Sequence, residues 1–227
     1  MKKIFVMMLF IFSISIYAQE LSRFIDVNGT SEVMTEADYI HFSIIIRSVA
    51  ETLEKSKQEN INASDELVNI LTDFNISKGE WELSPIKFGK EYSYSNNERK
   101  HVGYYAQVNV SVKLKNMSDY YSFINALSKN KLYEISNSYY GVSDLLKYHR
   151  EATINAVQAA REKAEYIAKS MGVKLGKIIQ IKELNQFETY PNALNAVTNQ
   201  AGGNSYEEIS GKVSINRSVN LKIEIID

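Results

Sequence analysis

The amino-acid sequence predicts an α+β domain with a mainly antiparallel sheet, in which one long alanine-rich helix and one or two further helices pack on strands joined as hairpins. First, several segments alternate apolar and polar residues, which is typical of strands with one buried face. Second, pairs of such segments are followed by segments of helical spacing, an order found in α+β domains. Third, a long stretch of alanines and charges runs from Asp144 to Gly172 and predicts an amphipathic helix.

The most regular alternation lies at residues 38–48 and predicts a half-buried strand. Its two faces are Ile40, Phe42, Ile44 and Ile46 on the apolar side, and Tyr39, His41, Ser43 and Arg47 on the other. Residues 24–34 predict a partner strand for it, with Gly29 as a bulge or a point of close approach. From residue 50 to 74 the period becomes helical. The apolar residues at this spacing are Leu53, Ile61, Leu67, Val68, Leu71 and Phe74.

The middle of the chain predicts a hairpin and a short helix. Residues 81–94 and 101–114 both read as strands, and the polar residues 95–100 between them suggest a hairpin with a long tip. Residues 116–130 predict a short helix with Ser118 as a candidate N-cap. The side chains along one side of this helix are Tyr121, Ile124 and Leu127.

The long helix has an expected packing face of small side chains. That face consists of Ala156, Ala160, Ala164, Ile167 and Met171, with Val157 and Ala168 beside them. The opposite side carries Arg161, Glu162, Glu165 and Lys169, of which Glu165 and Lys169 have the favourable i, i+4 order. Gly172 suits the left-handed position that ends a helix. The small side chains let a sheet or a second helix approach closely, so we predict that the alanine face packs and does not bind a ligand.

Strands are also predicted at residues 132–142, 175–184 and 212–226, the last as a long alternating strand. Residues 184–207 have no period and predict a long flexible surface loop, of the kind that is often functional. The repeated strand–strand–helix order suggests two βαβ-type halves within one domain, residues 19–227.

Residues 1–18 have the three-part pattern of a secretory signal peptide, with Lys2 and Lys3, an apolar run from 4 to 16, and Ala18. We expect cleavage after Ala18 and export to the periplasm or the outer membrane, with no transmembrane span in the mature chain. The alternative is an uncleaved anchor, although the apolar run is shorter than the ~20 residues of a spanning helix.

Composition excludes several classes of function. Removing the leader with its two lysines from the 26 basic residues leaves 24, against 27 acidic ones, so the charge favours neither nucleic acid nor an anionic membrane as partner. The chain has no cysteine, which excludes thiol catalysis, disulfides, lipid attachment and cysteine-bound metals. An exported protein without disulfides must be stabilised by its core or by assembly.

No residue pattern points to catalysis. The histidines His41, His101 and His149 lack the i, i+4 spacing of metal ligands, and Glu98 near His101 is only a loose metal motif, so we read them as solvated polar residues. Nucleophile elbows, phosphate loops and dinucleotide fingerprints are absent from the sequence. A carboxylate pair for glycoside hydrolysis remains open, but nothing singles one out. We therefore assign no catalytic, cofactor-binding or metal-binding residue, and expect no enzyme activity and no cofactor.

Tyrosines are concentrated in the middle of the chain. Their side chains could stack on sugars or form an interface. The simpler interpretation is that tyrosine favours strands and covers their half-exposed faces. The residues are Tyr92, Tyr94, Tyr104, Tyr105, Tyr120, Tyr121, Tyr133, Tyr139 and Tyr140.

Four stretches in this order and spacing resemble one family. They are VNGTSEVMTEADYIHFSI (27–44), HVGYYAQVNVSVKL (101–114), MGVKLGKI (171–178) and SGKVSINRSVNLKIEI (210–225). Together they resemble the SIMPL-domain proteins, the YggE-like and periplasmic immunogenic outer-membrane-type proteins, over residues 22–227. The family often has Pro-Asp before its second strand, where this chain has Ala37 and Asp38.

The resemblance implies an exported α+β protein of the envelope, linked to envelope or oxidative stress, with a relative that forms large ring-like oligomers. It carries no catalytic residues to this chain. We expect a homo-oligomer that acts by assembly or binding, with an envelope component or cell-wall glycan as a further partner. The alternatives are a glycan- or peptidoglycan-binding module that uses tyrosine-rich strand faces, and an envelope hydrolase that uses carboxylates.

Overall fold

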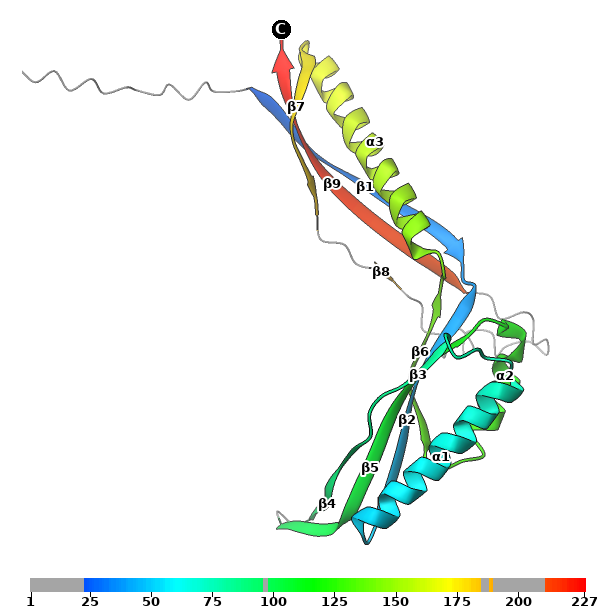
Figure 1. Cartoon of the computed structure of the whole chain (residues 1–227). Coiled ribbons are helices and arrows are strands. Elements are labelled where there is room, and N and C mark those ends of the chain that lie inside the picture. The colour runs from blue at the N-terminus through cyan, green and yellow to red at the C-terminus, as the bar shows by residue number, and fades with distance from the viewer. Residues whose placement is uncertain (1–22, 96–97, 185–187, 190–210) are drawn as a thin grey trace, which may run out of the picture.

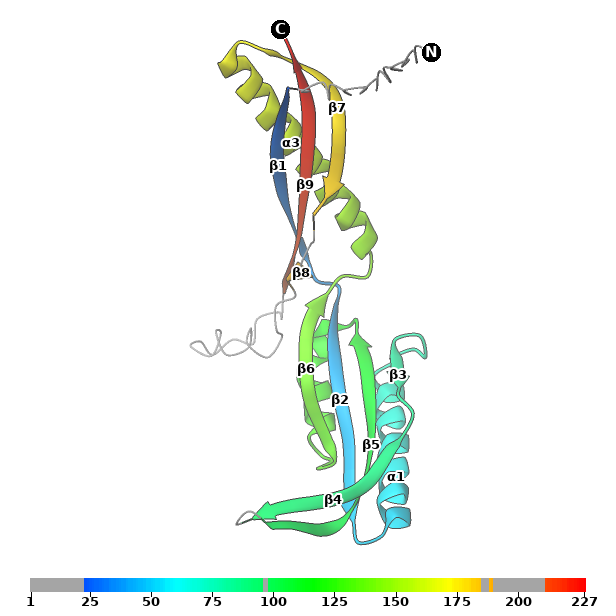
Figure 2. The ribbon, with the colours of Figure 1, turned by 90° about the vertical axis from the view of Figure 1, so that its left-hand side faces the viewer.

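The computed structural model describes residues 23–95, 98–184, 188–189 and 211–227. In this part of the chain the fold is α+β, with two antiparallel sheets and three α-helices, and the predicted fold class is confirmed. The two sheets lie end to end, and each carries its own helical layer on one face (Figures 1 and 2).

The first sheet has the order β1-β9-β7 and is covered by one long helix. Its strands are β1 (Phe24–Glu36), β9 (Lys212–Ile226) and β7 (Lys174–Glu183), while the short β8 (Glu188–Thr189) also pairs with β9. The helix α3 (Leu145–Met171) lies mainly over β1 and β9 and barely contacts β7. The core is therefore concentrated on one side of the sheet.

The second sheet has the order β3-β5-β2-β6. Its strands are β3 (Trp81–Leu83), β5 (Glu98–Leu114), β2 (Tyr39–Ala50) and β6 (Tyr133–Gly141), and β4 (Lys87–Ser95) also pairs with β5. The alternation of β2 is confirmed, since its four apolar residues are at most 1% exposed.

Two helices cover that apolar face. They are α1 (Leu53–Asp73) and α2 (Tyr120–Leu127), the latter preceded by the 3₁₀ turn η1 (Met117–Asp119). The other face of this sheet carries no helix from the described residues (Figure 2).

The predicted pairing of residues 24–34 with residues 38–48 is wrong. β1 pairs with β9 along its whole length, from Phe24 opposite Glu224 to Glu36 opposite Lys212. Ala37 and Asp38 alone connect the end of β1 to the start of β2. Neither is a glycine, the residue that favours a tight reversal of the chain in a two-residue hairpin. One long extended segment therefore contributes a strand to each sheet.

Hydrogen bonds hold this segment where the sheets meet. Ala37 N donates to Gly211 O at 2.7 Å, and Asp38 N donates to Gly141 O at 3.0 Å. A proline at position 37 could not make the first bond because it lacks an N–H. The departure from the family pattern, Ala37, therefore provides a backbone hydrogen bond where the sheets meet. The Asp38 carboxylate in turn accepts from Ser143 N at 2.8 Å.

The ends of the long helix are as predicted. The Asp144 carboxylate accepts from Lys147 N at 3.1 Å, and Gly172 adopts the left-handed φ of 69°. The buried face is a row of alanines at steps of four: Ala152, Ala156, Ala160, Ala164 and Ala168. Two details of the prediction are wrong. Met171, predicted on the packing face, is 61% exposed. Glu165, predicted to pair with Lys169 in the following turn, forms its ion pair at 3.1 Å with Arg161 in the preceding turn.

Replacing Ala160 with leucine is expected to lower the free energy of unfolding by about 1–3 kcal/mol, because a larger side chain overpacks a well-filled site. Ala160 is fully buried against β1 and β9. Chemical denaturation would measure the loss. Ala159→Leu, at a partly exposed neighbouring position, is the control and should leave the midpoint nearly unchanged. Equal midpoints for Ala160→Leu and wild type would contradict the packing.

Three further details differ from the predictions. The hairpin tip is short, because β4 and β5 pair as far as Ser95 opposite Glu98. Ser118 caps no helix, since it lies in η1 and its hydroxyl donates to Asn116 Oδ1 at 2.7 Å. The buried side of α2 consists of Tyr120, Phe123 and Leu127, so Tyr121 and Ile124 are only partly buried.

The side of the helix α1 that faces the sheet agrees only in part with the predicted one. Leu67 and Leu71 are fully buried as expected, but Ile61 is 44% exposed. The buried row is Ser56, Asn60, Ala63, Leu67 and Leu71. A buried polar side chain explains why this side of the helix faces the sheet: Asn60 Nδ2 donates to Ile46 O at 2.9 Å and to Ala106 O at 3.1 Å. These bonds to backbone carbonyls of the sheet orient the helix.

The predicted signal peptide at residues 1–18 lies outside the described residues, as does most of the predicted loop at 184–207. Within the described part of the chain, no helix has the length and apolar character needed to span a membrane.

Candidate functional site

The three histidines lie on separate elements. His41, on β2, stacks on Tyr139 with ring centroids 4.6 Å apart, and burial together with the nearby Lys113 lowers the pKa of its imidazole. His101 lies on β5 between two tyrosine rings, and His149 lies in the first turns of α3. Among residues 23–95, 98–184 and 211–227, no group of three or more histidine or carboxylate side chains is placed to hold a metal ion.

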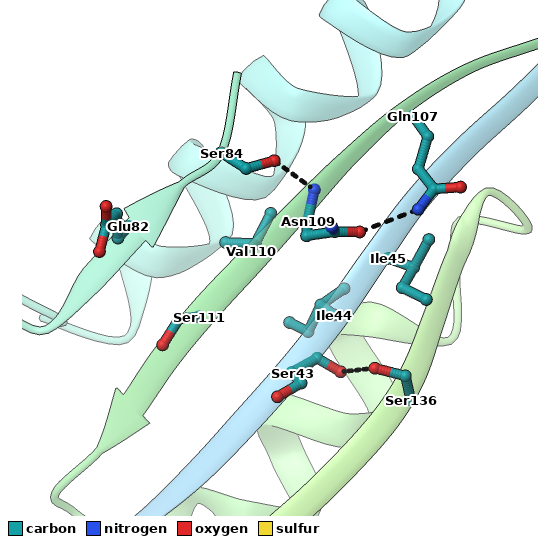
Figure 3. Close-up of a pocket in the computed structure, with 10 residues that line it drawn as sticks. All are labelled: Ser43, Ile44, Ile45, Glu82, Ser84, Gln107, Asn109, Val110, Ser111 and Ser136. Atoms are coloured by element: carbon teal, nitrogen blue, oxygen red, sulfur yellow. Dashed lines mark hydrogen bonds between the residues drawn. The ribbon is translucent and has the colours of Figure 1, made fainter. Parts of the chain in front are cut away.

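The face of the second sheet that carries no helix, which we call the polar face, contains a shallow hollow of about 550 Å³. Side chains from β2, β3, β5 and β6 and from the residue after β3 line it (Figure 3). The polar ones are Ser43, Glu82, Ser84, Gln107, Asn109, Ser111 and Ser136, with Ile45 between them. Strand alternation places them together, because the same strands direct their apolar residues to the helices.

Hydrogen bonds organise the hollow. Asn109 N donates to Ser84 Oγ at 3.0 Å, and Gln107 Nε2 donates to Asn109 Oδ1 at 3.0 Å (Figure 3). On the other side, Ser136 Oγ donates to Ser43 O at 3.0 Å, next to the irregularity in the pairing of β2 and β6. Four hydroxyls and two amides face one carboxylate, that of Glu82, so the hollow is polar and nearly neutral.

Aromatic side chains flank the hollow along the polar face. At one end is the stacked pair His41 and Tyr139, and His41 Nε2 lies 3.3 Å from the hydroxyl of Ser43. At the other end Arg47 lies over the ring of Tyr105 at 5.0 Å and forms an ion pair with Glu91, which compensates its charge.

Strand alternation divides the predicted tyrosine cluster. Tyr105 and Tyr139 belong to the polar face, while the neighbouring Tyr104 and Tyr140 point to the opposite side of their strands. Tyr140 is 1% exposed, and burial raises the pKa of its hydroxyl to about 12. The hydroxyl of Tyr133 donates to Ala63 O at 2.6 Å in the core, where burial raises its pKa as well.

A second surface lies on the first sheet, where α3 leaves β7 uncovered. We call it the β7 surface. It includes Ile178, Ile179 and Ile181, which are 55%, 47% and 59% exposed. Beside it is a groove of about 650 Å³ between α3 and β7, with an apolar floor and the charged Arg161, Glu165 and Lys169 along the helix.

The outer edges of the first sheet carry opposite charge. Within the described part of the chain, neither the outer edge of β1 nor that of β7 is paired with another strand. The acidic residues of β1 are Asp26, Glu32 and Glu36, and this strand has no basic residue. The strand β7 has three lysines and one glutamate: Lys174, Lys177, Lys182 and Glu183.

Sequence reasoning did not identify the hollow. Its polar residues were visible as the second face of each strand, but only the fold shows that none of the described helices covers that face. The β7 surface was also missed, because an apolar strand before a predicted loop gives no indication of which face remains uncovered.

Comparison with known families identifies the chain. The SIMPL family, described as a protein of unknown function (DUF541), matches residues 25–223. No curated protein matches the chain. The matched residues include both sheets and all three α-helices, and they confirm the resemblance noted in the sequence. The chain therefore belongs to the SIMPL family.

Proposed function

We propose that the chain is exported to the periplasm or the outer membrane and acts there by self-assembly, without covalent chemistry of its own. The observation that carries the proposal is the β7 surface, whose three isoleucines are about half exposed beside an apolar groove. Large exposed apolar patches commonly mark interaction sites. A role in envelope or oxidative stress follows from the family resemblance and belongs to the same proposal.

The interface that we propose places β7 of one copy beside β1 of the next. Both strands are antiparallel to β9, so they run in the same direction, and a neighbouring copy of the same orientation would extend the sheet by a parallel pair. Unpaired edges are templates for such pairing. The acidic edge of β1 and the predominantly basic edge of β7 are complementary in charge.

The spacing of the helices supports this arrangement. Three strands per copy give a repeat of about 14 Å across the sheet. A helix with its side chains is about 10–12 Å wide. The α3 helices of adjacent copies would therefore flank β7 from both sides and cover Ile178 and Ile181. Because the contact joins two different edges, repetition closes a ring where the rotation permits and otherwise gives a filament.

Replacing Ile181 with lysine is expected to reduce the assembly to monomers, because it puts a charge into the proposed contact. Light scattering of residues 19–227 over a wide concentration range measures this, and wild type should have a mass that is a multiple of the monomer mass. Ile154→Lys is the matched control, since Ile154 is 65% exposed on α3 but lies outside the groove. A monomeric wild-type protein at every concentration would exclude assembly.

Charge reversal tests which edges meet. Lys177→Glu with Lys182→Glu should weaken assembly, and adding Asp26→Lys with Glu32→Lys in the same chain should restore it. Restoration is specific to contact between β1 and β7, because a dimer formed by two β7 edges would not respond to changes in β1.

The second candidate function is the binding of a glycan or of peptidoglycan. The polar face supports it, because its polar, nearly neutral hollow lies between aromatic rings. Sedimentation with purified peptidoglycan tests it: the protein should pellet with the cell-wall material, whereas protein that remains in the supernatant at all concentrations would exclude this function.

A further inference from the structure

We propose that the hollow of the polar face is a binding site for a neutral, polyhydroxylated chain, with the sugar units lying along β2 and one of them stacking on Tyr139. This inference rests on the second candidate function and names its ligand class and its residues. It is independent of the proposed assembly, which uses the other sheet.

The lining groups match such a ligand. Hydroxyl groups both donate and accept hydrogen bonds, as sugar hydroxyls do, and four serines line the hollow. The hydroxyls of Ser84 and Ser136 already donate to Pro85 O and Ser43 O, so these two would accept hydrogen bonds from a ligand. The hydrogen bond from Gln107 Nε2 to Asn109 Oδ1 occupies the donor group of Gln107 and the acceptor of Asn109. The remaining amide groups, Asn109 Nδ2 and Gln107 Oε1, offer one donor group and one acceptor to a ligand, for example to an acetamido substituent.

Charge argues against an anionic ligand. Among the described residues that line the hollow, the one ionisable side chain is the carboxylate of Glu82, which would repel a polyanion. The guanidinium of Arg47, at the far end, already forms an ion pair with Glu91. A neutral chain is not repelled by the Glu82 carboxylate, and it can bind without displacing the ion pair of Arg47 and Glu91.

The dimensions suit a short segment of a chain. Small-molecule sites commonly have volumes of about 300–1,000 Å³, and the hollow has about 550 Å³. Along β2, the six residue steps from His41 to Arg47 correspond to about 20 Å. The aromatic groups at the two ends are thus separated by several sugar units, and His41 stacks on the ring of Tyr139 at one of these ends.

Isothermal titration calorimetry of residues 19–227 with triacetylchitotriose, a neutral trisaccharide, tests the site, and trigalacturonate serves as the anionic counterpart. We expect saturable binding of the neutral trisaccharide only. Tyr139→Ala and Asn109→Ala should each weaken it at least fivefold. Tyr104→Ala is the matched control, because this tyrosine lies on the opposite side of its strand, and it should leave the affinity unchanged.

The possible outcomes distinguish failure of the proposed binding site from failure of the second candidate function. If neither trisaccharide binds and the protein also fails to sediment with peptidoglycan, the second candidate function is excluded. If the trisaccharide binds but neither Tyr139→Ala nor Asn109→Ala weakens it, the ligand lies elsewhere and the inference is wrong. If Tyr139→Ala instead changes the mass in light scattering, the polar face is an interface between copies, which also overturns it. Thermal melting of each variant checks that the fold is retained.

Discussion

Replacing Gly29 with alanine is expected to lower the free energy of unfolding by about 3 kcal/mol, at the upper end of the usual cost of overpacking. Gly29 lies on β1 directly beneath α3. A Cβ atom there would lie 2.1 Å from Ala156 O and 2.3 Å from Ala160 N. Both are backbone atoms of a regular helix, so no rotation of a side chain relieves the contact and α3 must move away from the sheet.

Chemical denaturation measures this loss, and Gly79→Ala is the control. An added Cβ at Gly79 meets no atom within 4 Å, and its φ is not positive. This variant should therefore unfold at or slightly above the wild-type midpoint, because alanine restricts the unfolded chain more than glycine does. Equal midpoints for Gly29→Ala and Gly79→Ala would show that α3 does not approach β1 this closely.

The same contact explains how far the sequence predicts the fold of the first sheet. The spacing of the alanines predicts a packing face, and Gly29 predicts either a bulge or a close approach. The packing face and the close approach are confirmed. That these two features meet each other is not predictable from either one. The strand with Gly29 pairs with the last strand of the chain, about 190 residues away, and no local pattern encodes such a partner.

The helix α1 shows a different limit. Apolar periodicity predicts that Ile61 faces the sheet, whereas the structure places Asn60 there. The hydrogen bonds of Asn60 to two strand carbonyls outweigh the exposure of one isoleucine, because buried polar groups must be paired. Hydrophobic patterns carry no information about such a partner.

For the polar face, the sequence predicts which side chains share a face of each strand but not whether that face is covered. Tyr139 and Tyr140 are adjacent in the chain and equal in chemistry. One lies beside the hollow and the other is 1% exposed in the core. The tyrosine-rich part of the sequence therefore contains both candidate binding residues and core residues, and only the position of the helices distinguishes one group from the other.

Replacing Phe42 with alanine is expected to lower the free energy of unfolding by about 3–5 kcal/mol, because it removes a large side chain from a closely packed core. Phe42 is fully buried at the centre of β2. Its ring lies 5.2 Å from that of Phe123 and 5.9 Å from that of Tyr120, so the cavity would separate α2 from the sheet. The control is Phe88→Ala, because Phe88 is 50% exposed and its loss should cost about 0.5 kcal/mol or less.

Whether Phe42→Ala destabilises the first sheet as well as the second depends on how the two sheets are joined. The hydrophobic cluster around Phe42 includes Val213 and Ile215 of β9, and Ala152 of α3, which belong to the first sheet and its helix. Such a shared cluster should make the two sheets unfold together. Amide hydrogen exchange is therefore expected to show that Phe42→Ala lowers protection at Val213 and Ile215 as well as in β2. Unchanged protection in β9 would mean that each sheet unfolds separately, and that the contacts of Ala37 and Asp38 act as a hinge between them.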